Sequence, residues 1–352
     1  MPGPPAAVAS TRVAVRRWLR SVGLAPDALV LVACSGGADS LALAAAIAHV
    51  APREGWRAAA VVVDHGLQDG SRQVAHRTAA VVSGLGLPVQ VVRCDVGPTA
   101  AGPEADARRA RYGALVATAQ DLGADVVLLG HTRDDQAEQV LLGLLRGSGA
   151  RSLAGMPPRR ALGGVEGNQA RRPVGAKGNQ TARPVGGGPL LGRPLLGVSR
   201  AQTVQACADL GLEPWSDPHN EDPRYTRVRA RRVLAVLGAE LGRGVVRGLT
   251  RTADLLRDDA DALDEAAEAA YRGLGEPPWP VAELSALPRA VRTRLWRRLA
   301  LGAGSPGTDL TREHLLAVDD LVTGWRGQGP LHLPGRVRAG RSGDRVWLRG
   351  PA

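Results

Sequence analysis

The chain has 352 residues, 44% of them hydrophobic, and its 45 lysine and arginine residues exceed its 34 acidic residues, giving a formal net charge of +11. This length predicts two domains, and the charge is as consistent with a polyanionic partner as with a solvated basic surface. No apolar run approaches the roughly 20 residues of a membrane helix, and the N-terminus lacks the apolar core of a signal peptide. These features argue against a membrane protein, and three widely spaced cysteines that suggest no disulfide framework favour the cytoplasm.

The N-terminal residues 1–24 predict an amphipathic basic helix. After Leu29, strand and helix patterns then alternate along the chain. The expected pairs are 30–33 with 38–49, 58–63 with 71–85, 89–94 with 104–122, and 126–130 with 134–145. The strand segments are continuous apolar runs, as in parallel sheets covered by helices on both faces. The sequence therefore predicts an α/β fold, a doubly wound parallel sheet, with ligands at the carboxyl ends of its strands.

A segment of different character follows at about residues 157–192. It is rich in Gly, Pro and Arg and contains a near duplicate, Gly167–Gly175 and Gly178–Gly186. Without apolar periodicity it predicts a flexible insertion rather than a structural repeat. Lys177, the only lysine of the chain, lies in it, so a catalytic lysine is not expected.

The remaining chain predicts a second domain that is mainly helical. Residues 1–215 are assigned to the first domain and 216–352 to the second. The helix expected at 200–210 still belongs to the first domain. In the second, helices are expected at a stretch ending near Gly238 and at 248–272, 283–301 and 311–322, and short strands at 331–333, 336–341 and 345–349.

Ser35 to Ser40, Ser-Gly-Gly-Ala-Asp-Ser, lies where the first apolar strand meets a helix. Adjacent glycines and a helix N-terminus favour phosphate binding, although the turn lacks the lysine of the common P-loop. An acidic residue beside a phosphate is tolerable when it holds Mg²⁺, and Asp39 is the candidate. The alternative is an ordinary Gly-rich turn with Ser and Asp as helix caps.

A second cluster of polar residues follows the strand at 126–130. His131, Asp134, Asp135 and Glu138 lie at the same sheet edge, and Asp135 and Glu138 share one helix face. These carboxylates could cap the helix, bind Mg²⁺ or hold a cationic amine. His131 could contact the reacting groups or be structural.

Several further strings accompany the loop. They are Val63 to Leu67, Glu104 to Arg108 with Arg111-Tyr112, Gly130 to Glu138, Leu145 to Gly149, Arg193 to Leu196, and Asp217-Pro218 with Asn220. Together they resemble the tRNA(Ile)-lysidine synthetase family of the PP-loop ATP pyrophosphatases, in a short form without the extra C-terminal domain. Departures include Gln68, Gln139, His219 and Val228.

The resemblance implies a ligase that uses ATP and Mg²⁺. ATP would adenylate the wobble cytidine of the CAU anticodon in tRNA(Ile), and free L-lysine would then displace AMP to form lysidine. In this reading Asp39, His131, Asp135 and Glu138 are catalytic, and Asp39 and Asp135 bind metal. The resemblance further implies ATP contacts at Ser35, Gly36, Gly37, Ala38, Asp39, Ser40, Asp64 and His65; lysine contacts at Glu104, Arg108, Asp135 and Glu138; and tRNA contacts at Arg146, Arg224, Arg227, Arg229 and Arg231.

Two alternatives remain open at this stage. One is a tRNA-thiolating relative, which the widely spaced Cys34, Cys94 and Cys207 disfavour because they form no C-x-x-C pair. The other is a basic RNA-binding module without catalysis. The sequence leaves the oligomeric state undecided, with a homodimer among the options.

Overall fold

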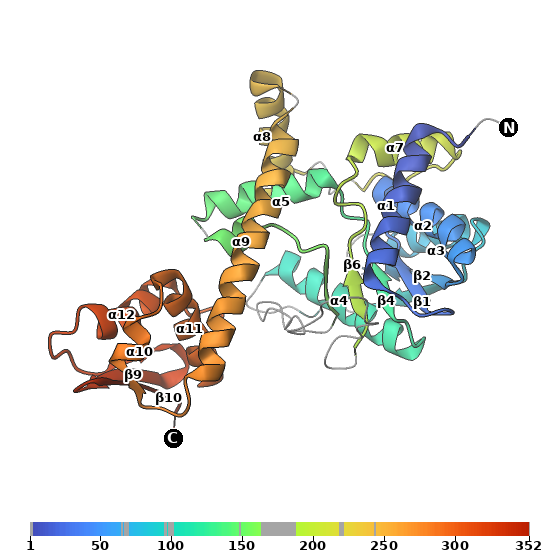
Figure 1. Cartoon of the computed structure of the whole chain (residues 1–352). Coiled ribbons are helices and arrows are strands. Elements are labelled where there is room, and N and C mark those ends of the chain that lie inside the picture. The colour runs from blue at the N-terminus through green and yellow to red at the C-terminus, as the bar shows by residue number, and fades with distance from the viewer. Residues whose placement is uncertain are drawn as a thin grey trace. The chain divides into compact units, whose positions relative to one another are not determined.

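The computed structural model describes residues 3–64, 66, 70–94, 97, 102–147, 149–162, 188–217, 222–242 and 244–351, apart from the side chains of Pro103 and Glu104. The chain forms two compact units (Figure 1). The first extends to Ala253 and the second begins at Asp254.

The first unit is built on a six-stranded sheet in the order β3-β2-β1-β4-β6-β5. Five of its strands are parallel, and the edge strand β5 is antiparallel to β6. The strands are β1 (Leu29–Ala33), β2 (Arg57–Asp64), β3 (Val89–Arg93), β4 (Val126–Leu128), β5 (Arg159–Ala161) and β6 (Leu190–Gly192). The prediction of an α/β fold with a mainly parallel sheet is confirmed.

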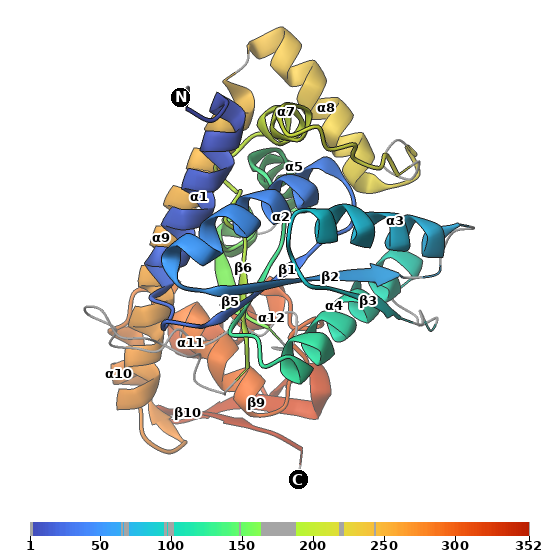
Figure 2. The same cartoon turned by 90° about the vertical axis from the view of Figure 1, so that its right-hand side faces the viewer.

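Alternate residues of the strands point to opposite faces, and helices cover both (Figure 2). Val30 and Val32 pack into the core that also includes residues of α1, α2, α3 and α7, whereas Leu29 and Leu31 pack with α4. These helices are α1 (Ala6–Val22), α2 (Ala38–Val50), α3 (Ser71–Gly84), α4 (Pro103–Asp121) and α7 (Arg200–Asp209), with the short η1 (Ala51–Glu54) after α2.

Both ends of the segment predicted as a flexible insertion belong to the sheet. β5 and β6 pair through Arg160 and Leu191, and β6 continues the parallel sheet beside β4. The prediction of an insertion over 157–192 is therefore wrong at its two ends, where ladder hydrogen bonds hold three-residue strands that carry no periodic signal. Residues 163–187 lie outside the described part of the chain.

The unit is completed by α5 (Arg133–Leu145), α6 (Ala150–Leu153), α8 (Thr226–Leu241) and the first turns of α9 (Val245–Gly273). Ala137 and Leu141 of α5 pack against Ala230 and Leu234 of α8 in a small separate core. Because of this contact, α8 belongs to the first unit, and the division of the chain falls at Ala253 rather than near residue 215.

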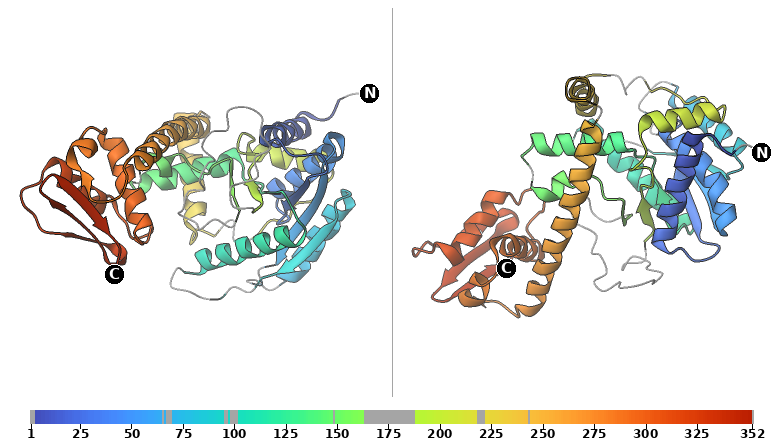
Figure 3. Two further views of the ribbon diagram at one scale, coloured as in Figure 1. Left: turned by 60° about the horizontal axis from the view of Figure 1, so that its bottom comes forward. Right: turned by 45° about the horizontal axis from the view of Figure 1, so that its top comes forward.

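The second unit contains an antiparallel sheet in the order β7-β10-β9-β8, with helices on one of its faces (Figure 3). The elements after α9 are β7 (Trp279–Pro280), α10 (Val281–Ser285), α11 (Arg289–Gly302), α12 (Arg312–Thr323), β8 (Leu331–Leu333), η3 (Pro334–Arg336), β9 (Val337–Ser342) and β10 (Arg345–Arg349).

Residues 283–301, expected as one helix, form two. Pro288 occupies the N-cap of α11 in an extended conformation, and a proline disfavours helix at the preceding residue. Within the core, Arg292 donates to both oxygens of Asp319 at 2.5 and 3.0 Å, which joins α11 to α12. None of the helices in the described residues has the length and hydropathy needed to cross a membrane.

Candidate active site

The turn between β1 and α2 is held by its own side chains. Ser40 Oγ accepts a hydrogen bond from the N–H of Ser35 at 3.2 Å and donates to the carbonyl oxygen of Gly37 at 2.9 Å. Gly36 has φ of +86°, and a Cβ there would overlap the hydroxyl of Thr78. No described side chain caps α2. The first N–H groups of this helix are therefore free of side-chain acceptors, as an anion site at a helix N-terminus requires.

Gly130, two residues after β4, lies close to the backbone of this turn. A Cβ at Gly130 would lie 2.9 Å from the carbonyl carbon and oxygen of Asp39 and 3.0 Å from the N atom of Ser40. These neighbours are backbone atoms, so a side chain at Gly130 must displace the turn itself.

Gly130→Ala is accordingly expected to weaken ATP binding at least tenfold, because it shifts the phosphate-binding backbone. Isothermal titration calorimetry with ATP measures the loss. Gly113→Ala is the matched control, since a Cβ at Gly113 on α4 meets no atom within 4 Å. An unchanged ATP affinity in Gly130→Ala would contradict a nucleotide site at this turn.

Three carboxylates surround the guanidinium group of Arg200, at the start of α7. Arg200 Nη2 lies 2.6 Å from Asp135 Oδ1, Nη1 lies 3.3 Å from Glu138 Oε1, and Nε lies 3.5 Å from Asp39 Oδ2. The structure thus brings Asp39 of the turn together with Asp135 and Glu138 of α5. Arg200 was not among the predicted site residues.

Neighbouring groups position each carboxylate further. Thr203 donates its hydroxyl hydrogen to Asp39 Oδ1. Asp135 Oδ2 accepts from the N–H and the hydroxyl of Thr132 at 2.7 and 2.8 Å, in a capping box that starts α5. Glu138, only 3% exposed, also accepts from Arg231 Nε at 2.8 Å. Asp135 therefore does take part in capping α5, which was one alternative for its role. Capping uses only its Oδ2 atom, and Oδ1 contacts Arg200.

The environment moves the acidities of two carboxyls in opposite directions. Burial raises the pKa of Asp39, and the nearby Asp135 adds to this, against the opposing effect of Thr203 and Arg200. Burial also acts to raise the pKa of Asp135, but Arg200 and the Thr132 N–H bring it below its ordinary value. Diverging acidities in neighbouring carboxyls are common at functional sites.

His131 lies beside Arg193, whose Nε is 3.2 Å from His131 Nδ1. Burial, followed by the charge of Arg193, lowers the pKa of His131 to about 3. The imidazole is therefore neutral at physiological pH, so it can accept a hydrogen bond from Arg193 but carries no charge to offer a phosphate.

This lowered pKa predicts an acid-dependent loss of stability. Between pH 6.5 and about 3 the unfolded chain binds a proton at His131 that the folded chain does not, so stability falls as the pH falls. His131→Gln should flatten the dependence of urea midpoint on pH in this range. His332→Gln, at an exposed histidine, serves as the control. An equal slope in His131→Gln and the parent protein would contradict a neutral buried imidazole.

Arginines surround Tyr112 on α4. The guanidinium carbons of Arg108, Arg160 and Arg111 lie 5.0, 5.1 and 5.8 Å from the centre of its ring. Burial would raise the pKa of Tyr112, but Arg108 and neighbouring arginines bring it below its ordinary value. The predicted lysine-binding residue Arg108 therefore belongs to an electropositive cluster.

The arginines predicted to bind tRNA occupy two kinds of position. Arg146 is exposed after α5, Arg227 is half-buried, and Arg224 pairs with Asp222 at 2.7 Å. Arg229 donates to the carbonyl oxygens of Pro223 and Arg224, near the start of α8. Arg231 instead joins Arg200 at Glu138, inside the carboxylate cluster.

Other predicted residues are placed only in part. Asp64, at the end of β2, is buried and accepts from the N–H of Gly66 at 3.1 Å. His65 lies outside the described residues, and so does the side chain of Glu104.

Arg200 and Thr203 are the site residues that sequence reasoning missed. The only local signal is the capping box of Ser199 and Gln202, which sets the start of α7 and so the direction of Arg200.

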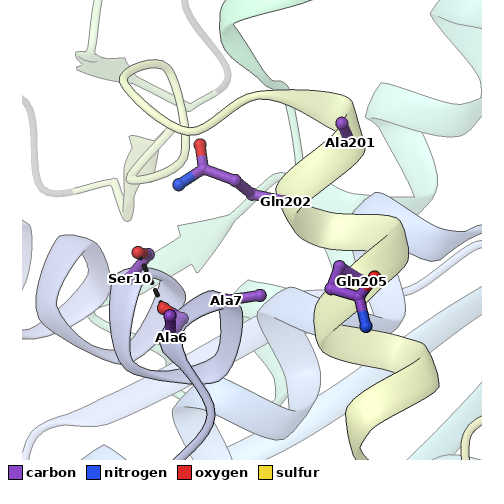
Figure 4. Close-up of a pocket in the computed structure, with 6 residues that line it drawn as sticks. All are labelled: Ala6, Ala7, Ser10, Ala201, Gln202 and Gln205. Atoms are coloured by element: carbon purple, nitrogen blue, oxygen red, sulfur yellow. Dashed lines mark hydrogen bonds between the residues drawn. The ribbon is translucent and has the colours of Figure 1, made fainter.

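A hollow of about 310 Å³ lies between α1 and α7 (Figure 4). It is lined by Ala6, Ala7, Ser10, Ala201, Gln202 and Gln205. Ser10 donates to the carbonyl oxygen of Ala6, and Gln202 accepts from the N–H of Ser199. The hollow presents no charged side chain, so it does not compete with the carboxylate cluster as a site for ATP chemistry.

The carboxylates of Asp39 and Asp135 are chemically suited to bind Mg²⁺, but in this structure both form ion pairs with Arg200. Asp39 and Asp135 supply the hard oxygen ligands that Mg²⁺ prefers. No group of three or more acidic, histidine or cysteine side chains arranged to hold a metal is found in the described part of the chain. One or two carboxylates with substrate phosphates is a usual Mg²⁺ environment, so these two residues fit the ion.

Two family models and one solved structure match this chain. Residues 11–237 match the model of a PP-loop domain, and residues 280–347 match that of a TilS substrate binding domain. The U34-tRNA thiolase NcsA from Methanococcus maripaludis, with its [4Fe-4S] cluster, is similar in fold, with a TM-score of 0.55 and 16% identity. That alignment covers 71% of this chain and 80% of the thiolase chain.

Curated relatives match over nearly the whole length. The chain is 53% identical to the tRNA(Ile)-lysidine synthase of Thermobifida fusca over 98% of both chains, and 48% identical to that of Streptomyces coelicolor over 99% of both. By these matches, the chain belongs to the tRNA(Ile)-lysidine synthase family.

Proposed function

We propose that this enzyme is an ATP-dependent ligase that joins free L-lysine to carbon 2 of the wobble cytidine in tRNA(Ile) with a CAU anticodon. One observation carries the assignment of residues. Asp39 of the phosphate-binding turn and Asp135 and Glu138 of α5 converge on one cationic group, the guanidinium of Arg200. The position that holds this cation is suited to a metal ion or an ammonium group.

In the first step, the cytidine carbonyl oxygen attacks the α-phosphorus of ATP, and pyrophosphate leaves. The turn of Ser35 to Ser40, with Asp64 and His65 at the next strand, would bind the nucleotide. Mg²⁺ bound by Asp39 and Asp135 would neutralise charge on the departing phosphates. Asp39 is oriented for this role by Thr203 and Arg200.

In the second step, an amine of lysine forms a bond to carbon 2, and the carbon–oxygen bond to AMP breaks. Asp135 and Glu138 would bind the ammonium group before it loses its proton, in exchange for Arg200. Arg108 lies in the electropositive cluster around Tyr112, which suits the carboxylate of the amino acid. Glu104 is proposed for the same pocket.

The tRNA would contact arginines near the start of α8 and the end of α5. Arg146 and Arg229 are exposed, and Arg224 and Arg227 lie on the same segment as Arg229. Arg231 would act differently, because its contact with Glu138 makes it a positioning residue for the carboxylate cluster. A homodimer remains a prediction.

Thiolation is disfavoured by the state of the cysteines. Burial raises the pKa of Cys34, and burial together with Asp39 raises that of Cys207 to about 11. Both are therefore thiols at neutral pH, whereas the thiolate is the form that attacks and carries sulfur.

The test is incubation with ATP, Mg²⁺, labelled lysine and unmodified tRNA(Ile) with a CAU anticodon. Lysine should enter the RNA with one AMP released per lysine. Methionine tRNA, which shares the anticodon, is the control and should stay unlabelled. AMP formation without lysine in RNA would demand another nucleophile, and neither product would favour a binding module without catalysis.

A further inference from the structure

One face of the sheet in the second unit is covered by helices, and the other carries basic side chains. Val337, Ala339, Val346 and Leu348 pack into the core of the unit. Because strand residues alternate, the residues between them face away from this core. The outward residues of β8, β9 and β10 are His332, Arg338, Gly340, Ser342, Arg345, Trp347 and Arg349, and we call this set the outer face.

A row of basic side chains crosses the outer face. Arg338 pairs in register with Arg349 on one side and with His332 on the other, and all three side chains are exposed. Arginines directly opposite each other on neighbouring antiparallel strands repel. β8, β9 and β10 contain no acidic residue that would offset the repulsion. An anion between Arg338 and Arg349 would remove it.

Trp347 adds a flat aromatic surface beside this row. It pairs with Gly340, where a Cβ would come within 2.5 Å of the indole ring, so the ring lies over the glycine backbone. The guanidinium carbon of Arg349 is 5.3 Å from the centre of this ring. An aromatic ring on an open sheet face, flanked by arginines, is how several RNA-binding domains stack an unpaired base.

Charge in the second unit is strongly segregated along the chain. Residues 331–349 contain five arginines and one acidic residue, Asp344, which lies in the turn between β9 and β10. By contrast, residues 254–268 of α9 contain seven acidic residues and one arginine. The outer face is therefore complementary to a polyanion, independently of the net charge of the chain.

We propose that the outer face binds an unpaired stretch of RNA, with one base stacked on Trp347 and its neighbouring phosphates between Arg338 and Arg349. The stretch belongs to the substrate tRNA if the proposed function is correct. A duplex is disfavoured as the occupant, because its bases are already stacked and leave the indole ring without a partner.

The first test measures binding of the full-length protein to a fluorescent unpaired RNA of about eight nucleotides, by anisotropy. Trp347→Ala should weaken binding roughly fivefold to a hundredfold, as expected for one lost base stack. Trp347→Tyr keeps an aromatic ring and should restore most of the affinity. Trp325→Ala is the matched control, because Trp325 also carries a stacked arginine, Arg341, but lies off the outer face.

The second test removes the paired arginines. Arg338→Gln with Arg349→Gln should lower the slope of log affinity against log salt by roughly one to one and a half units. The melting temperature of the free protein should stay the same or rise, because a repulsive pair is lost. Arg289→Gln with Arg312→Gln, at exposed sites on α11 and α12, is the control.

Equal affinity of parent protein and Trp347→Ala, or equal binding of a blunt RNA duplex or polyglutamate, would overturn the proposal. A lower melting temperature of the double arginine variant, with an unchanged salt slope, would mean that Arg338 and Arg349 stabilise the fold and do not bind RNA. That result would also overturn the proposal. These measurements need no lysine transfer, so they stand even if the proposed reaction fails.

Discussion

Asp39→Asn is expected to lower lysine transfer to tRNA, and the accompanying AMP release, by at least a thousandfold. The substitution keeps the size of the side chain and its hydrogen bond with Thr203 but removes the charge. Without that charge, the turn would lose the metal ligand that we propose beside the leaving pyrophosphate. Transfer of labelled lysine under saturating ATP and tRNA measures the loss.

Asp209→Asn is the matched control, because Asp209 is an exposed aspartate at the end of α7 whose side chain accepts a hydrogen bond from Gln205. Both variants should melt near the parent temperature. Retention of more than a tenth of the parent rate in Asp39→Asn would remove Asp39 from the catalytic residues, whereas a low melting temperature would point to a structural role.

Arg200→Gln is expected to destabilise the first unit by about 2–3 kcal/mol and to lower lysine transfer at least a hundredfold. This loss is smaller than that for a fully buried ion pair, because the Arg200 side chain is 27% exposed. The variant leaves Asp39, Asp135 and Glu138 close together without their shared counter-charge. Urea unfolding and lysine transfer measure the two effects.

Arg200→Lys separates charge from geometry. A lysine supplies one compact charge and cannot form the fork that contacts three carboxylates, so it should recover part of the stability but little of the rate. Arg200→Gln should also raise the pKa of Asp135, which Arg200 holds below its ordinary value. The stability that ionised Asp135 contributes is lost as the pH falls through its folded pKa, so this loss should move to higher pH.

If Arg200→Gln and the parent protein unfold at the same urea concentration and transfer lysine equally fast, the contacts of Arg200 with the carboxylates have no energetic consequence. Binding of Mn²⁺ to the protein without ATP is an independent test of whether Arg200 occupies the metal site. Removal of the internal guanidinium should strengthen Mn²⁺ binding if this ion and Arg200 compete for the same oxygens.

Local patterns in the sequence were sufficient for the main sheet and its helices. Continuous apolar runs predict β1, β2 and β4 within one or two residues, because strands covered on both faces need apolar side chains at nearly every position. The edge strand β3, which contains Gln90 and Arg93, is also predicted within one residue. The turn from Ser35 to Ser40 and the carboxylates after β4 could also be placed at one sheet edge, because parallel strands end there together. Their roles in catalysis remain predictions.

Only the tertiary structure decided features that depend on partners distant in the chain. β5 and β6 are three-residue strands in a Gly- and Pro-rich region, where pairing with each other and with β4 replaces any local signal. α8 follows a segment that looks like the start of a new domain, yet Ala230 and Leu234 bury their side chains against α5.

The candidate site likewise combines features set by the local sequence with features set by tertiary contacts. The sequence by itself determined which residue types surround the phosphate-binding turn, because glycine, serine and aspartate are needed at fixed spacing within one short segment. It did not determine that Arg200 would join Asp39, Asp135 and Glu138, since these contacts span more than 60 residues. A guanidinium reaches three carboxylates only when α7 packs beside α2 and Thr132 caps the start of α5, and that packing is set by the whole sheet.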